Sequence, residues 1–178
     1  ARLNYFLGLQ TTDDNEAESA FNDGKDAAKI ASNMEPNKPD GFFWYGANLG
    51  ELCKRSPLTV GLQSVGDVQN AMNKVIELQP NYQGASAYDG LAQVELATRL
   101  KGGSPEKAVE YLEKGIALEG DNTNLHVHLA EAFLALDKQA DAKKQLNTAI
   151  HMTPNPDYLP EHKDAVAAAR KILDTKFQ

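Results

Sequence analysis

Four helix-ending residues recur along the chain at intervals of 34 to 44 residues, and this repetition limits the fold more than any other feature. Pro36, Pro80, Gly120 and Pro154 each follow a segment whose apolar residues have helical spacing. Proline and glycine both terminate helices. The segments contain frequent alanine and few β-branched residues, which favours helix over strand. Repetition with a period of about 20–50 residues is typical of solenoids, so we expect a row of helical hairpins.

The last interval, 34 residues long, carries the most specific pattern. Small and large apolar residues stand at fixed places in it, at Leu129, Ala130, Phe133, Ala142, Leu146, Ala149 and Pro154. This arrangement resembles the tetratricopeptide repeat (TPR), a helix–turn–helix unit of the same period. Only His126, at the usual tryptophan place, departs from the pattern. The resemblance implies an all-α, right-handed TPR α-solenoid of three to four helical hairpins with a C-terminal capping helix.

The same alignment predicts how a single TPR-like domain, residues 1–178, is divided. Its parts are a partial repeat 1–36, a repeat 37–80 with an insert at 55–65, repeats 81–120 and 121–154, and a capping helix 160–177. The repeat 81–120 fits the pattern only if four extra residues lie in its turn, around LKGGSPE. Within that turn Ser104, Pro105 and Glu106 form a typical helix start. The capping helix has one apolar stripe and carries Lys163, Arg170 and Lys171 on its opposite face.

The stretch GFFWYGANLG, residues 41–50, is the most unusual segment of the chain. We interpret it as the first helix of a hairpin, in which Gly46 and Ala47 are small because the partner helix approaches there. The spacing of its glycines fits no phosphate-binding motif. On the TPR alignment, Trp44 and Asn48 fall on the concave face. Two interpretations of Trp44 remain open: an anchor for a partner, or a core residue packed beneath the insert 55–65.

Charge and composition exclude several classes of partner. The formal net charge is −7, the pI is about 5.1, and no cluster of lysine and arginine is evident. Nucleic acids and anionic membranes attract clustered cations, so we expect neither as a partner. No apolar run approaches the length of about 18 residues that a membrane-spanning helix needs.

Signatures of catalysis and of metal binding are missing from the sequence. There is no zinc-protease, serine-hydrolase or paired-cysteine motif, so we expect no enzyme and no cofactor. His126 and His128 point in opposite directions on a helix, which is unsuitable for a shared metal. We interpret His126 as a core residue, and His128 as facing either the groove or a neighbouring repeat. Cys53 stands beside two cations that would lower its pKa, but without a histidine or acid partner we expect a structural thiol.

The concave groove is where we expect binding. The resemblance to TPR proteins places nine residues there: Trp44, Asn48, Glu51, Asp89, Gln93, Asn124, Val127, Glu131 and Leu134. This set is polar, acidic and partly aromatic. It departs from the carboxylate-clamp TPRs that hold chaperone C-termini, because Asn48 matches the clamp whereas Asp89, Gly90 and His128 do not. The acidic members would select against acidic ligands.

The inserts narrow the resemblance to particular groups of TPR proteins. The motifs WYGANLG, SPLT, NYQGASAYDGLAQVE and GGSPEKA, all within residues 37–152, are similar to those of the bacterial TRAP-transporter-associated T component. They also resemble TPR-like regulators of microtubule dynamics in eukaryotes. The T-component resemblance implies a periplasmic or lipid-anchored extracytoplasmic protein, with a cytoplasmic location as the alternative. Because the sequence starts at Ala1 rather than Met, we expect either a trimmed chain or a processed precursor whose signal segment was removed.

The primary hypothesis is therefore a non-catalytic scaffold that binds a protein or peptide in its groove, with a periplasmic solute-binding protein as the partner implied by the resemblance. One alternative is small-molecule binding in a pocket near Trp44, covered by the insert 55–65. Another is a structural module that self-assembles into a homo-oligomer.

Overall fold

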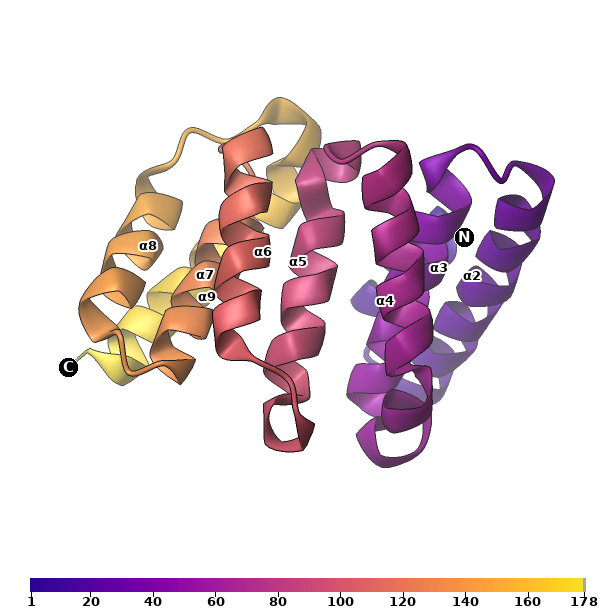
Figure 1. The fold of residues 1–178 in the computed structure, drawn as a ribbon, viewed down its shortest axis with the longest axis horizontal. Helices are drawn as coiled ribbons and strands as arrows, with labels where there is room; N and C mark the ends of the chain where they lie inside the picture. The colour runs from indigo at the N-terminus through magenta and orange to yellow at the C-terminus, as the bar shows by residue number, and fades with distance from the viewer. Residues whose placement is uncertain (178) are drawn as a thin grey trace. The chain divides into compact units, whose positions relative to one another are not determined.

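The structure is a computed structural model that describes residues 1–177, apart from the side chains at positions 58, 59 and 62. Throughout these residues the regular structure is helical, and no strand is present. The chain divides into two compact units, one from Ala1 to Tyr82 and the other from Gln83 onward. The prediction of an all-α fold built from successive helices is confirmed (Figure 1).

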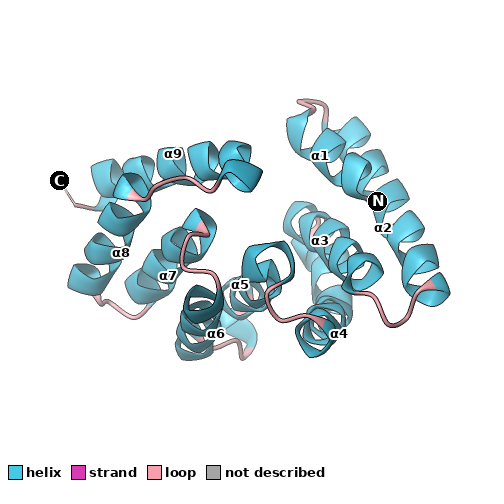
Figure 2. Cartoon of the chain, turned by 90° about the horizontal axis from the view of Figure 1, so that it is seen from above, coloured by secondary structure: helices cyan, strands magenta, loops and turns pink. Residues whose placement is uncertain are grey.

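The first unit is a stack of antiparallel neighbours. Its elements are α1 (Arg2–Gln10), α2 (Asp14–Met34), α3 (Pro39–Arg55), the short π-helix η1 (Pro57–Gly61) and α4 (Leu62–Leu78). Each of these helices packs on the next one along the chain, as the view from above shows (Figure 2). The predicted insert 55–65 corresponds to the end of α3, η1 and the start of α4. Its side chains at 58, 59 and 62 lie outside the described residues.

The second unit repeats the same plan with five helices. Its elements are α5 (Tyr82–Ala97), the 3₁₀ turn η2 (Arg99–Lys101), α6 (Pro105–Leu118), α7 (Thr123–Ala135), α8 (Gln139–His151), the 3₁₀ turn η3 (Pro156–Tyr158) and α9 (Leu159–Lys176). The residues of the 34-residue pattern form its core, since Leu129, Ala130, Ala142, Leu146 and Ala149 are all buried. The pattern therefore marks the positions at which α7 and α8 meet.

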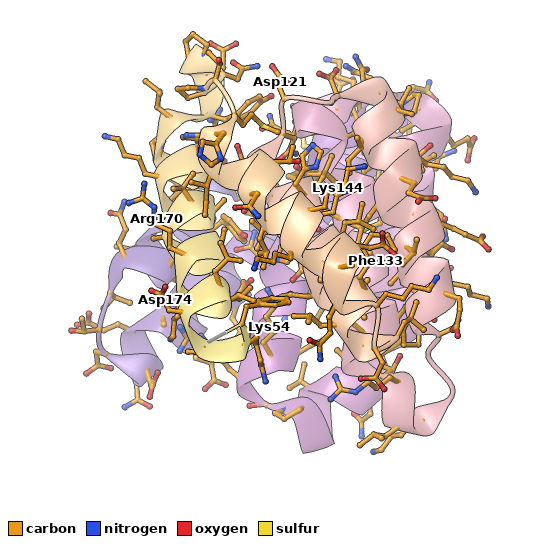
Figure 3. All side chains as sticks on the ribbon, turned by 90° about the vertical axis from the view of Figure 1, so that its left-hand side faces the viewer. Lys54, Asp121, Phe133, Lys144, Arg170 and Asp174 are labelled. Atoms are coloured by element: carbon orange, nitrogen blue, oxygen red, sulfur yellow. The ribbon has the colours of Figure 1, made fainter. Side chains whose placement is uncertain are left out.

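Helix α9 packs on both α7 and α8, as a capping helix is expected to do. Ala165 and Ala169 are buried against the hairpin core, and Ile172 and Leu173 are packed against it. On the other side of the helix, Arg170 and Asp174 project away from α8 (Figure 3). The apolar stripe in the sequence thus faces the hairpin, and the charged stripe faces outward.

Two helix starts form as their sequences indicate. The Asp13 carboxylate caps α2 by accepting hydrogen bonds from the backbone N–H groups of Asn15 (2.8 Å) and Glu16 (3.0 Å). The Ser104 hydroxyl caps α6 by accepting from the Lys107 N–H at 3.2 Å. Hydrogen bonds from its own backbone N–H and from Ser104 hold the pKa of Glu106 below its usual value. These acidic residues therefore serve helix ends, where unpaired N–H groups favour negative charge.

Helix α5 begins with an unusual turn. Gln83, Gly84 and Ala85 have φ values of 50°, 62° and 59°, so the chain makes one left-handed turn before the right-handed helix starts. The Asn122 side-chain amide donates a hydrogen bond to the Gly84 carbonyl at 2.6 Å. Because left-handed residues other than glycine are costly, this turn depends on contacts such as that of Asn122.

Three glycines of α3 differ sharply in the space around them. A methyl group added at Gly41 would meet the backbone of Ser32 in α2, with Ser32 Cα only 2.6 Å away. One added at Gly46 would meet the Met72 side chain of α4 at 2.8 Å. At Gly50 nothing lies within 4 Å. Gly41 and Gly46 are therefore needed for close helix contact on two sides of α3, whereas Gly50 is not.

We predict that Gly41→Ala lowers the stability of the protein by about 1–3 kcal/mol, because the new methyl group meets backbone atoms that cannot rotate away. The matched control, Gly50→Ala, should instead raise stability by about 0.5–1 kcal/mol, since alanine is the better helix former in open space. Thermal denaturation followed by circular dichroism measures both changes. Equal effects of the two substitutions would show that the α2–α3 approach is not as close as described.

Candidate functional site

The first helix of each hairpin carries the residues predicted for the groove, and the structure places them in two separate groups. Trp44, Asn48 and Glu51 lie on α3 in the first unit. The others lie on α5 and α7 in the second unit. The two groups differ in burial and in chemistry, so each is described by itself.

Trp44 lies in the interior of the first unit, with 8% of its surface exposed. Its ring contacts those of Tyr5 and Phe6 from α1, at centroid distances of 5.6 and 6.1 Å, and that of Phe43 at 5.0 Å. The Arg2 guanidinium lies 5.8 Å from the centroids of both Phe6 and Trp44. The indole is therefore covered by α1, and the more accessible rings of this cluster belong to Tyr5 and Phe6.

The other two α3 residues are also engaged within the unit. Asn48 is fully buried, donates to the Trp44 carbonyl at 2.7 Å, and lies against Gly24 of α2. The Glu51 carboxylate pairs with Lys54 at 2.7 Å. The structure thus places Asn48 at a helix crossing rather than on an open surface.

In the second unit, three side chains from α5 and α7 form a hydrogen-bonded network that we call the Asp89 network: Asp89, Gln93 and His128. Asp89 Oδ1 is 2.6 Å from His128 Nδ1, and Asp89 Oδ2 accepts from the Gln93 amide at 2.9 Å. Because a carboxylate only accepts hydrogen bonds, the proton of this contact lies on the imidazole nitrogen. Only 8% of the Asp89 surface is exposed, and both of its carboxylate oxygens nevertheless have a hydrogen-bond partner.

The network continues onto a polar face of α7. Asn124, His128 and Glu131 are spaced at i, i+4 and i+7, so they share one side of that helix. Asn124 is half-buried and Glu131 is exposed. The two remaining groove predictions on α7, Val127 and Leu134, are buried and half-buried in the core. The accessible part of this face is therefore made of amide, imidazole and carboxylate groups.

His128 is the one member of this network that the predicted site omits. The sequence does carry a signal for His128. It stands two residues after His126, so the two side chains must point in opposite directions on one helix. His126 is buried, and its Nδ1 lies 2.7 Å from Gln145 Oε1 of α8. The interpretation of His126 as a core residue agrees with these contacts. Of the two orientations left open for His128, the groove or a neighbouring repeat, its contact with Asp89 of α5 fits the second.

The Asp89–His128 contact lends itself to a double-mutant cycle. We predict that Asp89→Asn and His128→Gln are each destabilising and that their effects are not additive, with a coupling free energy of about 0.5–3 kcal/mol. The physical reason is that either change leaves a buried polar partner poorly satisfied. Urea denaturation at neutral pH measures the cycle, and effects that simply add would contradict the contact.

Cys53 lies in the first unit and is half-buried. The two neighbouring cations are directed elsewhere: Lys54 pairs with Glu51, and Arg55 pairs with Asp14 at 2.8 Å. Burial raises the pKa of the Cys53 thiol above its ordinary value. The expectation of an unactivated, structural thiol agrees with these surroundings.

Alkylation of Cys53 by iodoacetamide should therefore depend on pH in a defined way. The thiolate is the reactive form, so the midpoint of the rate profile should lie at higher pH in the folded protein than in the urea-unfolded chain. A folded-state midpoint below that of the unfolded chain would show an activated thiol instead.

Two further findings concern membranes and metals. None of the described helices has the length and apolar character that crossing a membrane requires. Among the described residues, no three histidine, cysteine, aspartate or glutamate side chains come together as a metal site would require.

Comparison with known proteins agrees with the resemblance seen in the motifs. No curated protein matches the chain. A family model does match, over residues 1–172, and its description is TRAP transporter T-component. Because this match covers nearly the whole chain, the protein belongs to the TRAP transporter T-component family.

Proposed function

We propose that this protein acts beside a TRAP transporter as a non-catalytic adaptor, which binds the transporter's periplasmic solute-binding protein through the face that carries the Asp89 network. Membership of the T-component family supports the accessory role. The observation that carries the rest of the proposal is the partly buried carboxylate–imidazole pair between α5 and α7.

The energetics of this pair favour a role in recognition over a role in stability. Taking hydrogen-bonding groups out of water costs about as much as their mutual hydrogen bond returns, so a well-packed apolar pair would hold α5 and α7 together about equally well. Charged and polar groups at an interface instead provide specificity and register. We infer that Asp89 fixes the positions of His128 and Gln93, and that Gln93 and Asn124 offer hydrogen bonds to the partner.

The partner's place in the cell sets the place of this protein. A solute-binding protein of this kind works outside the cytoplasmic membrane, so we propose a periplasmic or lipid-anchored extracytoplasmic location. Trp44 and Asn48 are packed inside the first unit, so the proposed contact is confined to the second unit.

The proposal predicts that Asn124→Ala combined with Glu131→Lys weakens binding of the purified solute-binding protein of the same organism's TRAP transporter by about tenfold or more. Glu131 is exposed and Asn124 is half-buried, and neither belongs to the apolar core, so the change acts on the polar face of α7 and leaves the core intact. Isothermal titration calorimetry measures the affinity.

A matched control makes the same chemical changes on the second helices of the hairpins. Glu113→Lys with Asn147→Ala alters an exposed glutamate of α6 and an exposed asparagine of α8. We expect this variant to bind like the wild-type protein. If both variants weaken binding equally, or if neither weakens it, the α7 face is not part of the interface.

A further inference from the structure

The turn that joins α5 to α6 presents one apolar side chain to solvent between two cations. We call residues 98–104 the α5–α6 turn. Leu100 at its tip is 92% exposed, more than any other large apolar residue whose exposure the structure gives. Arg99 and Lys101 flank it, are both exposed, and make no ion pair with any described residue. In Figure 1 this turn extends beyond the lower ends of α5 and α6.

The length of this turn is more than a helical hairpin needs. In the same unit, α7 and α8 are joined by residues 136–138 alone, with Asp137 in the left-handed region at φ 56°. The α5–α6 turn uses the seven residues 98–104, four more than the α7–α8 connection, as the repeat pattern indicated. Each ordered residue costs conformational entropy, so the additional length requires a reason other than connecting two helices.

Several hydrogen bonds hold the turn in one conformation. The buried Glu95 carboxylate accepts from the Ser104 N–H at 2.8 Å. The Thr98 carbonyl accepts from the N–H groups of Lys101 (2.7 Å) and Gly103 (3.1 Å). The Thr98 hydroxyl donates to the Val94 carbonyl at 2.8 Å. The tip is therefore attached to α5 at both of its ends.

The two glycines of the turn meet the geometric demands of this conformation. Gly102 has a φ of 105°, where residues with a side chain are strained. A methyl group at Gly103 would collide with the Glu95 carbonyl and the Thr98 hydroxyl. Leu100 is thus displayed on a preformed support, and a side chain held in this way loses little freedom when it binds.

We propose that Leu100 is a docking residue that inserts into an apolar pocket of a partner protein whose rim carries carboxylates. The cations on both sides of Leu100 select the acidic rim, because complementary charges steer and align protein partners. This inference rests on the proposed function, and the partner to which it commits is the solute-binding protein of the transporter.

A membrane surface is the other occupant to consider, and the chemistry of the turn does not favour it. Stable attachment to a membrane requires two anchoring signals, such as two lipid chains or one chain with a polybasic patch. A single leucine with two cations falls well short of that requirement, and the formal charge of −7 on the whole chain opposes approach to anionic lipid. In a protein pocket, by contrast, one leucine adds to the contacts of a larger interface.

The test compares Leu100→Ser with Leu3→Ser, which makes the same change at another exposed leucine, on α1. The probe is the purified solute-binding protein, titrated by calorimetry after circular dichroism has shown that both variants are folded. We expect Leu100→Ser to weaken affinity about tenfold or more, and Leu3→Ser to leave it unchanged. A second pair tests the charges: Arg99→Ala with Lys101→Ala should reduce the salt dependence of binding, whereas Lys163→Ala with Arg170→Ala on α9 should not.

The possible outcomes separate this inference from the function on which it rests. If the wild-type protein binds the solute-binding protein and Leu100→Ser binds it equally well, only the docking role of Leu100 is overturned. A wild-type protein that does not bind the solute-binding protein would overturn both proposals. Sedimentation of the wild type, but not of Leu100→Ser, with phosphatidylserine vesicles would identify a membrane as the occupant and overturn the assignment to a protein pocket.

Discussion

The close approach of neighbouring helices is the constraint on which the rest of this structure depends. In the first unit it requires glycine at positions 24 and 41, where any larger residue would meet Asn48 or the backbone of Ser32. In the second unit it is met by alanines and one glycine, at positions 108, 115, 142 and 149. Helices in such contact exclude water and fix each other's rotation. Each hairpin therefore determines which side of its first helix is not covered by its second helix.

That remaining side has a different composition in the two units. In the first unit it is aromatic, and α1 covers most of it, so Trp44 acts as a core residue. In the second unit it is polar, with the Asp89 network half-accessible between α5 and α7. A polar network of this kind is costly unless all of its members are satisfied, and both oxygens of Asp89 are. Asp89 thereby holds the His128 and Gln93 side chains in fixed positions between α5 and α7.

The repeat period made the helices predictable, because spacing and helix-ending residues are local properties of a sequence. The pattern at Leu129, Ala130, Ala142, Leu146 and Ala149 correctly located the core of the second unit. The direction in which Trp44 and Asn48 point was harder to predict from the sequence. The TPR alignment treats the first repeat as partial, whereas α1 and the long α2 enclose α3 on the sides that carry these two residues. Their surroundings depend on helices from another part of the chain, which the spacing within residues 41–50 does not report.

Among the described residues, the start of α5 has the most unusual local backbone. The left-handed turn at residues 83–85 is stabilised by Asn122, which also caps α7 by accepting from the Asn124 N–H at 3.1 Å. One side chain thus joins the start of α5 to the start of α7, the two helices that carry the Asp89 network. Natural sequences break local rules chiefly where function requires it, at a cost met by other contacts. Asn122 supplies such contacts here, and it places the unusual turn and the polar network in one connected structure.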